Sequence, residues 1–498
     1  MRLDRVLLLA AALVLPAGFA SADVVPYPLF TDNMVLQQGV EIPVWGKADP
    51  GEDVSVALVQ GDIESPVKVK ADGDGKWLVK LPKAKAGTGF KLEIEGKNKI
   101  LFKNVAVGEV WIGSGQSNME WSVNASYNPT DVRNAAKNTN LRIFTVTKRT
   151  ATAPITDQGD LKHFSKWDES SPENVGAFSA VAYHFGNHLQ KSLGVPVGMI
   201  HTSWGGTPAE AWTSIEALEA EPTLKYYVQN AANAAKGKQP VGPGTPASLY
   251  NAMIHPLLPF AIKGAIWYQG ESNAGKAYEY RTLFPAMIND WRKKWGVEDM
   301  PFLAVQLAPF NDGDAEGVRY AELRDAQLFA TKSMKNVGMA VITDVGDLFD
   351  IHPKDKFTVG TRLGLAARGM VYGQKIISSG PTFKELKVEE GNAILSFENL
   401  GGGLAARSGP SGFSGTGLIY GFEVCGEDKD FFPAKGVIKG ETVVVSTPRV
   451  KKPVAVRYGW KNYPVINLFN KSTDGKITAL PASPFRTDDF PLTTMPKK

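Results

Sequence analysis

Residues 109–119 decide the fold, and they read EVWIGSGQSNM. The run from Glu109 to Gly113 is short and mostly apolar, as expected of a buried strand. A tight turn into a helix follows, and a serine on such a turn presents its hydroxyl outward. In an open parallel sheet, functional sites form outside the carboxyl ends of the strands. This stretch therefore predicts an α/β sheet with Ser117 at its functional edge.

The chain after residue 108 alternates between strand-like and helical segments, which predicts a parallel α/β domain over residues 106–380. The expected strands are 109–113, 141–146, 197–202, 264–268, 302–307 and 339–344. The expected helices are 180–193, 277–295, 318–331 and 359–372. Apolar residues recur at every fourth position of the first helix, which gives it one apolar face. Residues 231–247 are rich in Ala, Gly and Pro and are expected to form a long surface loop.

Two β-rich regions flank this domain. Residues 23–105 contain short runs rich in β-branched and aromatic residues, separated by turn sequences such as Asp49-Pro50-Gly51. That spacing predicts an N-terminal β-sandwich-like module. The helical period disappears after about Pro381, so residues 381–498 are expected to form a second, C-terminal β-rich module of sandwich type.

Residues 1–22 have the pattern of a cleavable signal peptide. Arg2 and Arg5 provide the positive start, residues 6–14 the apolar run, and Ala20-Ser21-Ala22 the small-residue cleavage site. The apolar run is well short of the ~20 residues that a membrane-spanning helix needs. We therefore expect cleavage after Ala22 and a mature protein that is secreted or periplasmic and has no membrane segment.

Composition excludes several classes of function. Apolar residues make up 43% of the chain and charged residues 21%, an ordinary globular balance. The net charge of +4 is small for 498 residues, and the basic residues are scattered, which argues against a nucleic-acid partner. Cys425 is the only cysteine, so no intrachain disulfide and no cysteine-based metal site can form. We expect neither a metal nor an organic cofactor.

Four compact motifs fall at or just beyond the ends of predicted strands. They are GQSNM at 115–119, SWGGT at 203–207, QGESN at 269–273 and DIHP at 350–353. Their order and spacing resemble those of the SGNH hydrolases, and within them the sialate O-acetylesterase family and related carbohydrate acetylesterases. The resemblance covers most of the mature chain and is weakest after about Pro381. It implies a serine esterase with a flavodoxin-like, three-layer core.

Ser117 and His352 are the expected nucleophile and general base. A serine hydroxyl is a poor nucleophile and needs an adjacent base with a pKa near neutrality, which histidine provides. His352 lies in a short polar loop, whereas His184 and His188 lie four residues apart on a helix, without the glutamate of a zinc protease between them. Packing roles therefore suit those two. Core or pocket-wall roles suit the remaining histidines, His163, His201 and His255.

The carboxylate that orients His352 is open between several residues. In an extended loop, residues two apart point to the same side, which favours Asp350. Many SGNH enzymes instead use an aspartate three residues before the histidine, and that position here is Phe349. The alternatives are Asp347, Asp344, Glu271 or a dyad of serine and histidine alone.

A tetrahedral intermediate needs donors for its oxyanion, each worth about 3–4 kcal/mol. The backbone amides of Ser117 and of Gly205 or Gly206 suit this role, because glycine lets the main chain approach a ligand. A side-chain amide from Asn273 or Gln269 is expected as a third donor, and the family resemblance supports this type of assignment. The side chains expected to contact substrate are Gln116, Asn118, Trp204 and Glu271, with a buried scaffold role as the alternative for Glu271.

Together these residues predict hydrolysis of O-acetyl esters on carbohydrates through an acetyl-enzyme. The resemblance implies O-acetylated sialic acid as substrate, with acetylated plant polysaccharides such as xylan as the alternative. Sialic acid carries a carboxylate, so its pocket should contain an arginine. Arg142, Arg319 and Arg324 of the α/β part are candidates for it. Remoter alternatives are a non-catalytic glycan-binding protein on a hydrolase scaffold and a serine peptidase or lipase.

Overall fold

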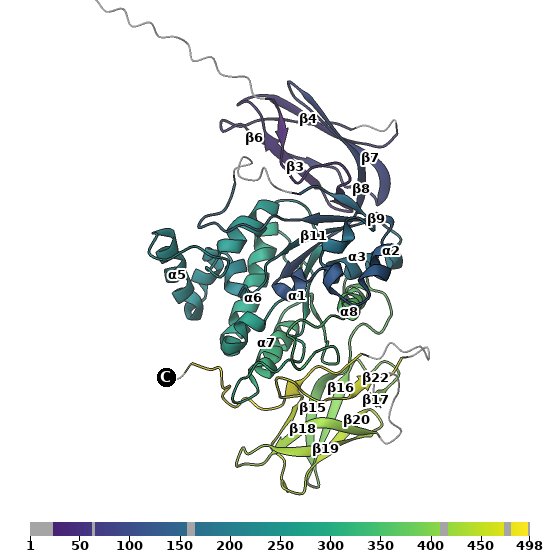
Figure 1. The fold of residues 1–498 in the computed structure, drawn as a ribbon, viewed down its shortest axis with the longest axis vertical. Coiled ribbons are helices and arrows are strands. Elements are labelled where there is room, and N and C mark those ends of the chain that lie inside the picture. The colour runs from purple at the N-terminus through teal and green to yellow at the C-terminus, as the bar shows by residue number, and fades with distance from the viewer. Residues whose placement is uncertain (1–22, 62–64, 157–164, 409–416, 473–479, 497–498) are drawn as a thin grey trace, which may run out of the picture.

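Three parts of the protein are stacked along its longest axis (Figure 1). The computed structural model describes residues 23–61, 65–156, 165–408, 417–472 and 480–496. An N-terminal β-rich module, purple in Figure 1, lies at one end, an α/β domain in the middle, and a C-terminal β-rich module, green to yellow, at the other end. The predicted signal peptide and His163 lie outside the described residues.

The middle part is built on a mostly parallel sheet. Its strands, in spatial order, are β10 (Asp168–Ser170), β9 (Asn138–Thr145), β11 (Val197–Ser203), β8 (Lys99–Gly115), β12 (Gly264–Tyr268), β13 (Phe302–Val305) and β14 (Val337–Ala340). Neighbours pair in parallel, except that β10 runs antiparallel to β9 at the edge. Counted along the chain, β8, β11, β12, β13 and β14 stand in the order 2-1-3-4-5. The winding therefore changes direction at β8, and such a switch point is where an open α/β sheet places its site.

Helices cover both faces of this sheet. The long ones are α3 (Ala180–Leu193), α6 (Ala277–Trp295), α7 (Arg319–Ser333) and α8 (Lys356–Met370), and the shorter ones are α1 (Ser117–Glu120), α2 (Pro129–Asn134), α4 (Ile215–Ala220) and α5 (Lys225–Ala235). Helices α3 and α8 pack together, as do α6 and α7. Because successive strand residues point to opposite faces, β12 contributes to two cores. Ile266 belongs to the core with Phe185 of α3 and Leu363 of α8, whereas Trp267 packs on Trp291 of α6.

The N-terminal module shares a strand with the α/β domain. The 17-residue β8 pairs first with strands of the module and then, from Glu109 onward, with β11 of the central sheet. The predicted border between residues 105 and 106 thus falls inside β8. The module's other strands are β1 (Val25–Pro26), β2 (Val35–Gln37), β3 (Ile42–Lys47), β4 (Asp53–Val59), β5 (Val67–Lys70), β6 (Lys76–Leu81) and β7 (Gly87–Glu95). The core is continuous as well, since the buried Trp167 indole donates to the Leu29 carbonyl at 3.1 Å.

The C-terminal module is an antiparallel sheet that packs against α7. Its strands, in spatial order, are β15 (Thr382–Glu389), β16 (Asn392–Glu398), β20 (Thr442–Ser446), β19 (Phe432–Lys439), β18 (Leu418–Cys425), β21 (Ala455–Tyr458) and β23 (Phe485–Arg486), with β17 (Leu404–Ala406) and β22 (Leu468–Asn470) as a separate pair. Leu328 of α7 belongs to the core of this module. The buried guanidinium of Arg324, also on α7, donates to the carbonyls of Lys461 and Asn462 at 2.8 and 2.9 Å. These contacts fix the module to the α/β domain.

Most predicted elements of the α/β domain are confirmed, and two need correction. Helices α3 and α6 and strand β12 have the predicted bounds. The last parallel strand was predicted at residues 339–344 but is Val337–Ala340, because only this stretch pairs with β13. The loop predicted over residues 231–247 is helical as far as Ala235, where alanines of high helix propensity extend α5.

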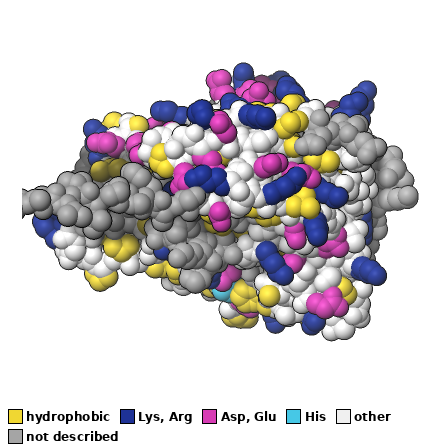
Figure 2. All heavy atoms as spheres, turned by 90° about the horizontal axis from the view of Figure 1, so that it is seen from above, with side chains coloured by type: hydrophobic (Ala, Val, Ile, Leu, Met, Phe, Trp, Pro, Cys, Tyr) yellow, Lys and Arg dark blue, Asp and Glu magenta, His cyan; other side chains and the backbone are white. Residues whose placement is uncertain are grey.

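The surface at the N-terminal end of the molecule carries charges of both signs. Lys and Arg side chains are interspersed there with Asp and Glu side chains (Figure 2). Within the described part of the chain, no helix combines the length and the apolar character that crossing a bilayer requires.

Candidate active site

Ser117 is the first residue of α1, two residues after the carboxyl end of β8. Gly115 makes this turn possible. Its φ is +138°, and a Cβ at this position would lie 2.2 Å from the carbonyl oxygen of Tyr268 on the neighbouring strand. Only glycine accepts both the backbone conformation and the close approach. The turn therefore carries Ser117 to the switch point of the sheet.

His352 lies beside Ser117. Its Nε2 is 2.9 Å from the Ser117 hydroxyl oxygen, although the two residues are 235 positions apart in the chain. The indole of Trp121 stacks on the imidazole, with ring centres 4.4 Å apart and an angle of 16° between the planes. The predicted nucleophile and base thus come within hydrogen-bond reach, the geometry that proton transfer from a serine requires.

The surroundings of His352 favour its neutral form. Burial lowers the pKa of this histidine and the nearby Lys356 ammonium lowers it further, while the charge of Asp350 acts in the opposite direction. A neutral imidazole can accept a proton, whereas an imidazolium cannot. His352 is therefore available as a base at neutral pH and somewhat below it.

Asp350 is close to the histidine without making a short contact to its ring. Its Oδ1 accepts the backbone N–H of His352 at 2.9 Å but lies 3.6 Å from Nδ1, beyond ordinary hydrogen-bond length. The Asp350 side chain is 47% exposed. This carboxylate differs in both respects from the buried, directly bonded aspartate of a serine-protease triad.

The other carboxylates proposed from the sequence are engaged elsewhere. Asp344 forms a two-pronged ion pair with Arg362, at 2.6 and 2.8 Å. Asp347 accepts the backbone N–H groups of Phe349 and Asp350 and so shapes the histidine loop. Glu271 accepts the side-chain amide of Asn118 at 2.6 Å. Among the described residues, Asp350 is thus the carboxylate that lies beside the imidazole.

The turn after β11 brings Gly205 next to Ser117. A Cβ added to Gly205 would lie 3.3 Å from Cβ of Ser117. The amide of Gly205, a predicted oxyanion donor, donates to the carboxylate of Glu120 at 2.7 Å, and the same carboxylate accepts from Lys148 at 2.6 Å. Gly206, the alternative donor, has a φ of +74° and is exposed. The glycine turn is therefore at the site, with an acidic side chain hydrogen-bonded to it.

The two predicted side-chain amides lie in a buried network behind this turn. The Gln269 side chain donates to Thr207 and to the amide oxygen of Asn273, at 3.3 and 2.6 Å. Asn273 in turn donates to Glu210 at 2.9 Å and accepts the Ala209 N–H at 2.9 Å. Within the described chain, none of the hydrogen bonds joins either amide to Ser117. Here both groups tie the third motif to the second.

Three of the four predicted substrate contacts instead hold the motifs together. Gln116 is buried and accepts the N–H groups of Gly270 and Ser272 at 3.3 and 3.2 Å. Asn118 is fully buried and bonds to Glu271 and to the carbonyl of Ile351, the residue before His352. Trp204 is partly exposed, with the Lys148 ammonium 5.4 Å from its ring centre.

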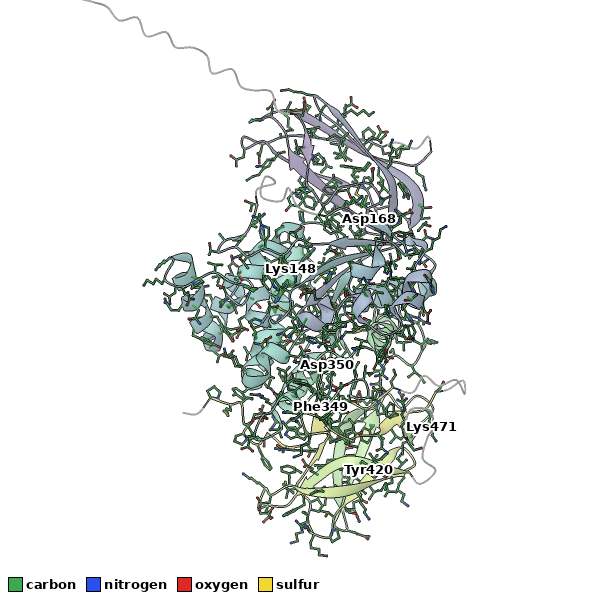
Figure 3. All side chains as sticks on the ribbon, viewed as in Figure 1. Lys148, Asp168, Phe349, Asp350, Tyr420 and Lys471 are labelled. Carbon is green, nitrogen blue, oxygen red and sulfur yellow. The ribbon has the colours of Figure 1, made fainter. Side chains whose placement is uncertain are left out.

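A pocket of about 520 Å³ opens at Ser117 and His352. Its other lining residues are Glu120, Trp121, Ser122, Ala125, Thr145, Val146, Lys148, Ala177, His201, Ser203 and Gly205. At its base the buried His201 bonds to the Ser203 hydroxyl at 2.6 Å, and burial lowers the pKa of His201 to about 4. Figure 3 shows Lys148 and Asp350 in the middle part of the molecule, with Phe349 on the side of the C-terminal module.

Sequence reasoning missed three charged residues of this site, Glu120, Lys148 and Lys356. Glu120 follows Ser117 by three positions, a spacing that places both on one helical face and could have been noticed. Lys148 is distant in sequence from every motif. Lys356 is fully buried, which runs against the strong tendency of lysine to be exposed, so no sequence pattern indicates it. Among the described residues, no group of three or more His, Cys, Asp or Glu side chains is arranged to hold a metal ion.

The part of the chain that forms this site is similar to a known protein family. Residues 107–366, which contain all four motifs, match the family model described as carbohydrate esterase, sialic acid-specific acetylesterase. The chain belongs to this family. As a member of the sialic acid-specific acetylesterases, it is a carboxylic ester hydrolase of the carbohydrate-esterase class.

Relatives of this acetylesterase extend beyond the matched domain. A curated sialate O-acetylesterase of Pongo abelii is 31% identical and covers 91% of this chain and 90% of its own length. The sialate O-acetylesterase of Homo sapiens is 34% identical over 73% of this chain and 74% of its own. A solved structure of a carbohydrate acetylesterase from Xanthomonas citri is 38% identical, with a TM-score of 0.83, covering 94% of this chain and all of the other. The similarity thus includes the flanking modules.

Proposed function

We propose that the protein hydrolyses O-acetyl esters on carbohydrates by a two-step mechanism in which Ser117 is the nucleophile and His352 the general base. The observation that supports this most directly is the 2.9 Å approach of His352 Nε2 to the Ser117 hydroxyl at the mouth of a pocket. The core is, on this proposal, a flavodoxin-like SGNH hydrolase domain between two β-rich modules. We also propose that the mature chain begins after Ala22 and works outside the cytoplasm.

In the first step, His352 takes the proton of Ser117 while the serine oxygen attacks the acetyl carbonyl carbon. Negative charge develops on the carbonyl oxygen and is stabilised by the amides of Ser117 and Gly205. The ester C–O bond then breaks, the sugar oxygen receives the proton from His352, and the acetyl group stays on Ser117. Asp350 stabilises the transient imidazolium electrostatically.

In the second step, water attacks the acetyl carbonyl carbon and His352 takes a proton from it. The bond to the Ser117 oxygen breaks, the serine oxygen receives the proton from His352, and acetate leaves. The Glu120 carboxylate accepts from the Gly205 amide in the free protein. The incoming carbonyl oxygen must therefore displace Glu120 before this amide can act as an oxyanion donor. Gln269 and Asn273 support the turn from behind through their hydrogen bonds to Thr207 and Ala209.

The names of the curated relatives support O-acetylated sialic acid as the substrate. The charge of the pocket favours a second candidate, a neutral acetylated sugar such as those of xylan. Lys148 is the one cation among the described lining residues, and it pairs with Glu120. The three arginines considered from the sequence bond elsewhere. Arg142 donates to Thr139, Asn33 and Asn104, Arg319 pairs with Asp312, and Arg324 binds carbonyls at the C-terminal module.

The test is acetate release from 9-O-acetylated sialic acid and from acetylated xylan, with wild type, Ser117→Ala and the control Ser272→Ala. Ser272 is an exposed serine of the third motif. We expect release to fall by at least ~10³-fold in Ser117→Ala and to be unchanged in the control. The ratio of the two substrates decides between the candidates. Release that survives in Ser117→Ala refutes the mechanism. Wild type without release, even from aryl acetates, would leave a glycan-binding protein on a hydrolase scaffold.

A further inference from the structure

Lys356 is a buried lysine beside the catalytic pair. It is the first residue of α8 and has no exposed surface, although four residues earlier in the chain His352 borders the open pocket. Its ammonium donates to the side-chain oxygen of Asn118 at 2.5 Å and lies 5.8 Å from the ring centre of Trp121. The ring centre of Tyr268 is 5.4 Å from the same ammonium. An ion is costly to bury, so this placement calls for a specific reason.

Asn118 is the group that links Lys356 to catalysis. The residue directly follows the nucleophile, and its side-chain oxygen accepts from Lys356. Its side-chain nitrogen donates to Glu271 at 2.6 Å and to the carbonyl of Ile351 at 3.0 Å. One amide therefore connects the nucleophile helix, the third motif, the histidine loop and the start of α8.

Lys356 reinforces the direction of the Asn118 amide, which the two acceptors at its nitrogen, Glu271 and the Ile351 carbonyl, also favour. An asparagine side chain can flip, and the hydrogen bonds it finds decide which way it points. A lysine ammonium can only donate, and a carbonyl can only accept. Lys356 on one side and the Ile351 carbonyl on the other therefore allow one orientation, in which the amide nitrogen faces the histidine loop.

The charges around Lys356 explain how the ammonium is retained. Burial lowers the pKa of Lys356 to about 7, while the carboxylates of Glu271, Asp350 and Asp355 act to raise it. Burial also raises the pKa of Glu271, opposed by backbone and Asn118 hydrogen bonds and by the charge of Lys356. Asp355, which precedes Lys356, caps α8 by accepting the N–H of Thr358. The cation thus lies near the acidic groups of Glu271, Asp350 and Asp355, and among the described residues only Asn118 hydrogen-bonds to the ammonium.

We propose that Lys356 is a positioning residue, whose ammonium orients the Asn118 side chain and thereby holds the Ile351 carbonyl and the loop that presents His352 to Ser117. The proposal rests on the proposed function of Ser117 and His352. A second consequence is electrostatic. The positive charge opposes protonation of the nearby imidazole, which keeps His352 in its basic form.

Two neutral variants separate the hydrogen bond from the charge. Lys356→Met removes both, whereas Lys356→Gln removes the charge and retains an N–H donor, one bond closer to the backbone than the lysine nitrogen. The control is Lys354→Met, because Lys354 is exposed and its backbone carbonyl still accepts the N–H of Lys356. For each variant, kcat/KM is measured against pH, and the rate at which a fluorophosphonate labels Ser117 is measured by mass spectrometry. Labelling depends on the serine–histidine geometry and needs no sugar substrate.

We expect Lys356→Met to reduce kcat/KM and the labelling rate by about 10²-fold, the scale of a misplacement near 1 Å. Lys356→Gln should lose less than tenfold. In both variants the acidic limb of the pH profile should move to higher pH, because removing a positive charge raises the pKa of His352. Lys354→Met should match wild type.

The proposal is overturned if folded Lys356→Met labels Ser117 at the wild-type rate, or if neither neutral variant moves the acidic limb. Should Lys356→Met not fold, Lys356→Gln decides the electrostatic part. An imidazole titration of His352 by NMR then replaces the kinetic profile. Because labelling and titration need no acetylated sugar, they remain informative if wild type releases no acetate, an outcome that would refute the proposed function alone.

Discussion

Asp350→Asn tests how far this site resembles a buried catalytic triad. The asparagine oxygen can still accept the backbone N–H of His352, which Asp350 Oδ1 accepts at 2.9 Å. The change therefore removes a charge and leaves the loop intact. What is lost is the attraction across the 3.6 Å between the carboxylate and Nδ1 of the imidazolium that forms during the reaction.

The magnitude follows from the exposure of the pair. The Asp350 side chain is 47% exposed, and ion pairs in contact with solvent contribute about 0.2–1 kcal/mol. A loss of that size in the transition state lowers kcat/KM by about 1.4- to 5-fold. In a triad with a buried, directly bonded aspartate, the same substitution costs about 10⁴-fold. The two arrangements thus predict rates that differ by more than three orders of magnitude.

The assay is kcat/KM for an aryl acetate across pH, with Asp347→Asn as the matched control. Asp347 accepts two backbone N–H groups of the same loop, which an asparagine can also accept, so this variant should behave as wild type. Burial and Lys356 lower the pKa of His352, and Asp350 opposes them. Removing the Asp350 charge therefore lowers that pKa further, and the acidic limb should move to lower pH. A drop of 10³-fold or more would show that Asp350 closes onto the imidazole during catalysis and would refute this reasoning.

Changes at Trp121 and Gly115 test how the structure holds Ser117 and His352 in place. Trp121→Ala removes the indole that stacks on His352 at 4.4 Å and should lower kcat by about tenfold. The histidine then becomes more exposed, which raises its pKa, so the acidic limb of the pH profile should move to higher pH. Trp121→Phe should keep most of the rate. Gly115→Ala places a Cβ 2.2 Å from the Tyr268 carbonyl oxygen and gives alanine a strained φ, which costs about 1–2 kcal/mol. Both the melting temperature and the rate should therefore fall. A melting temperature equal to that of wild type would contradict that account, and Gly206→Ala, at an open position with positive φ, separates the two causes.

The sequence predicts that Ser117 and His352 lie close together because the topology of the sheet brings their segments to one edge. Ser117 follows the carboxyl end of a central strand, and parallel strands bring all such ends to one edge. Helix α3 was predictable over its full length because its apolar residues recur with helical spacing. The end of strand β14 was not predictable from the sequence. The buried residues just after Ala340 are as apolar as the strand itself, and the strand ends there because its pairing with β13 ends.

The hydrogen-bond partners within the site were beyond the reach of sequence reasoning. The amides of Gln269 and Asn273 suit an oxyanion hole by type, but Thr207 and Glu210, more than sixty residues earlier, bind them. The role of Lys356 depends on burial, which composition does not indicate for a lysine. A buried lysine such as Lys356 is recognised only when the three-dimensional surroundings of its side chain are known.

The shared strand β8 limits where recombination between genes can separate the two parts of the protein that it joins. A module that ends at a linker can be exchanged between genes as a cassette, and the compositional border near residue 105 looks like such a junction. A recombination point there would instead lie inside β8, ten residues before Gly115. The strand that leads to Ser117 would then lose the part that pairs with the N-terminal module. The N-terminal module and the hydrolase should therefore pass through gene duplication and horizontal transfer as one unit. The C-terminal module is joined at a loop, but Arg324 and Leu328 of α7 also contact it, so a replacement module would have to preserve these contacts.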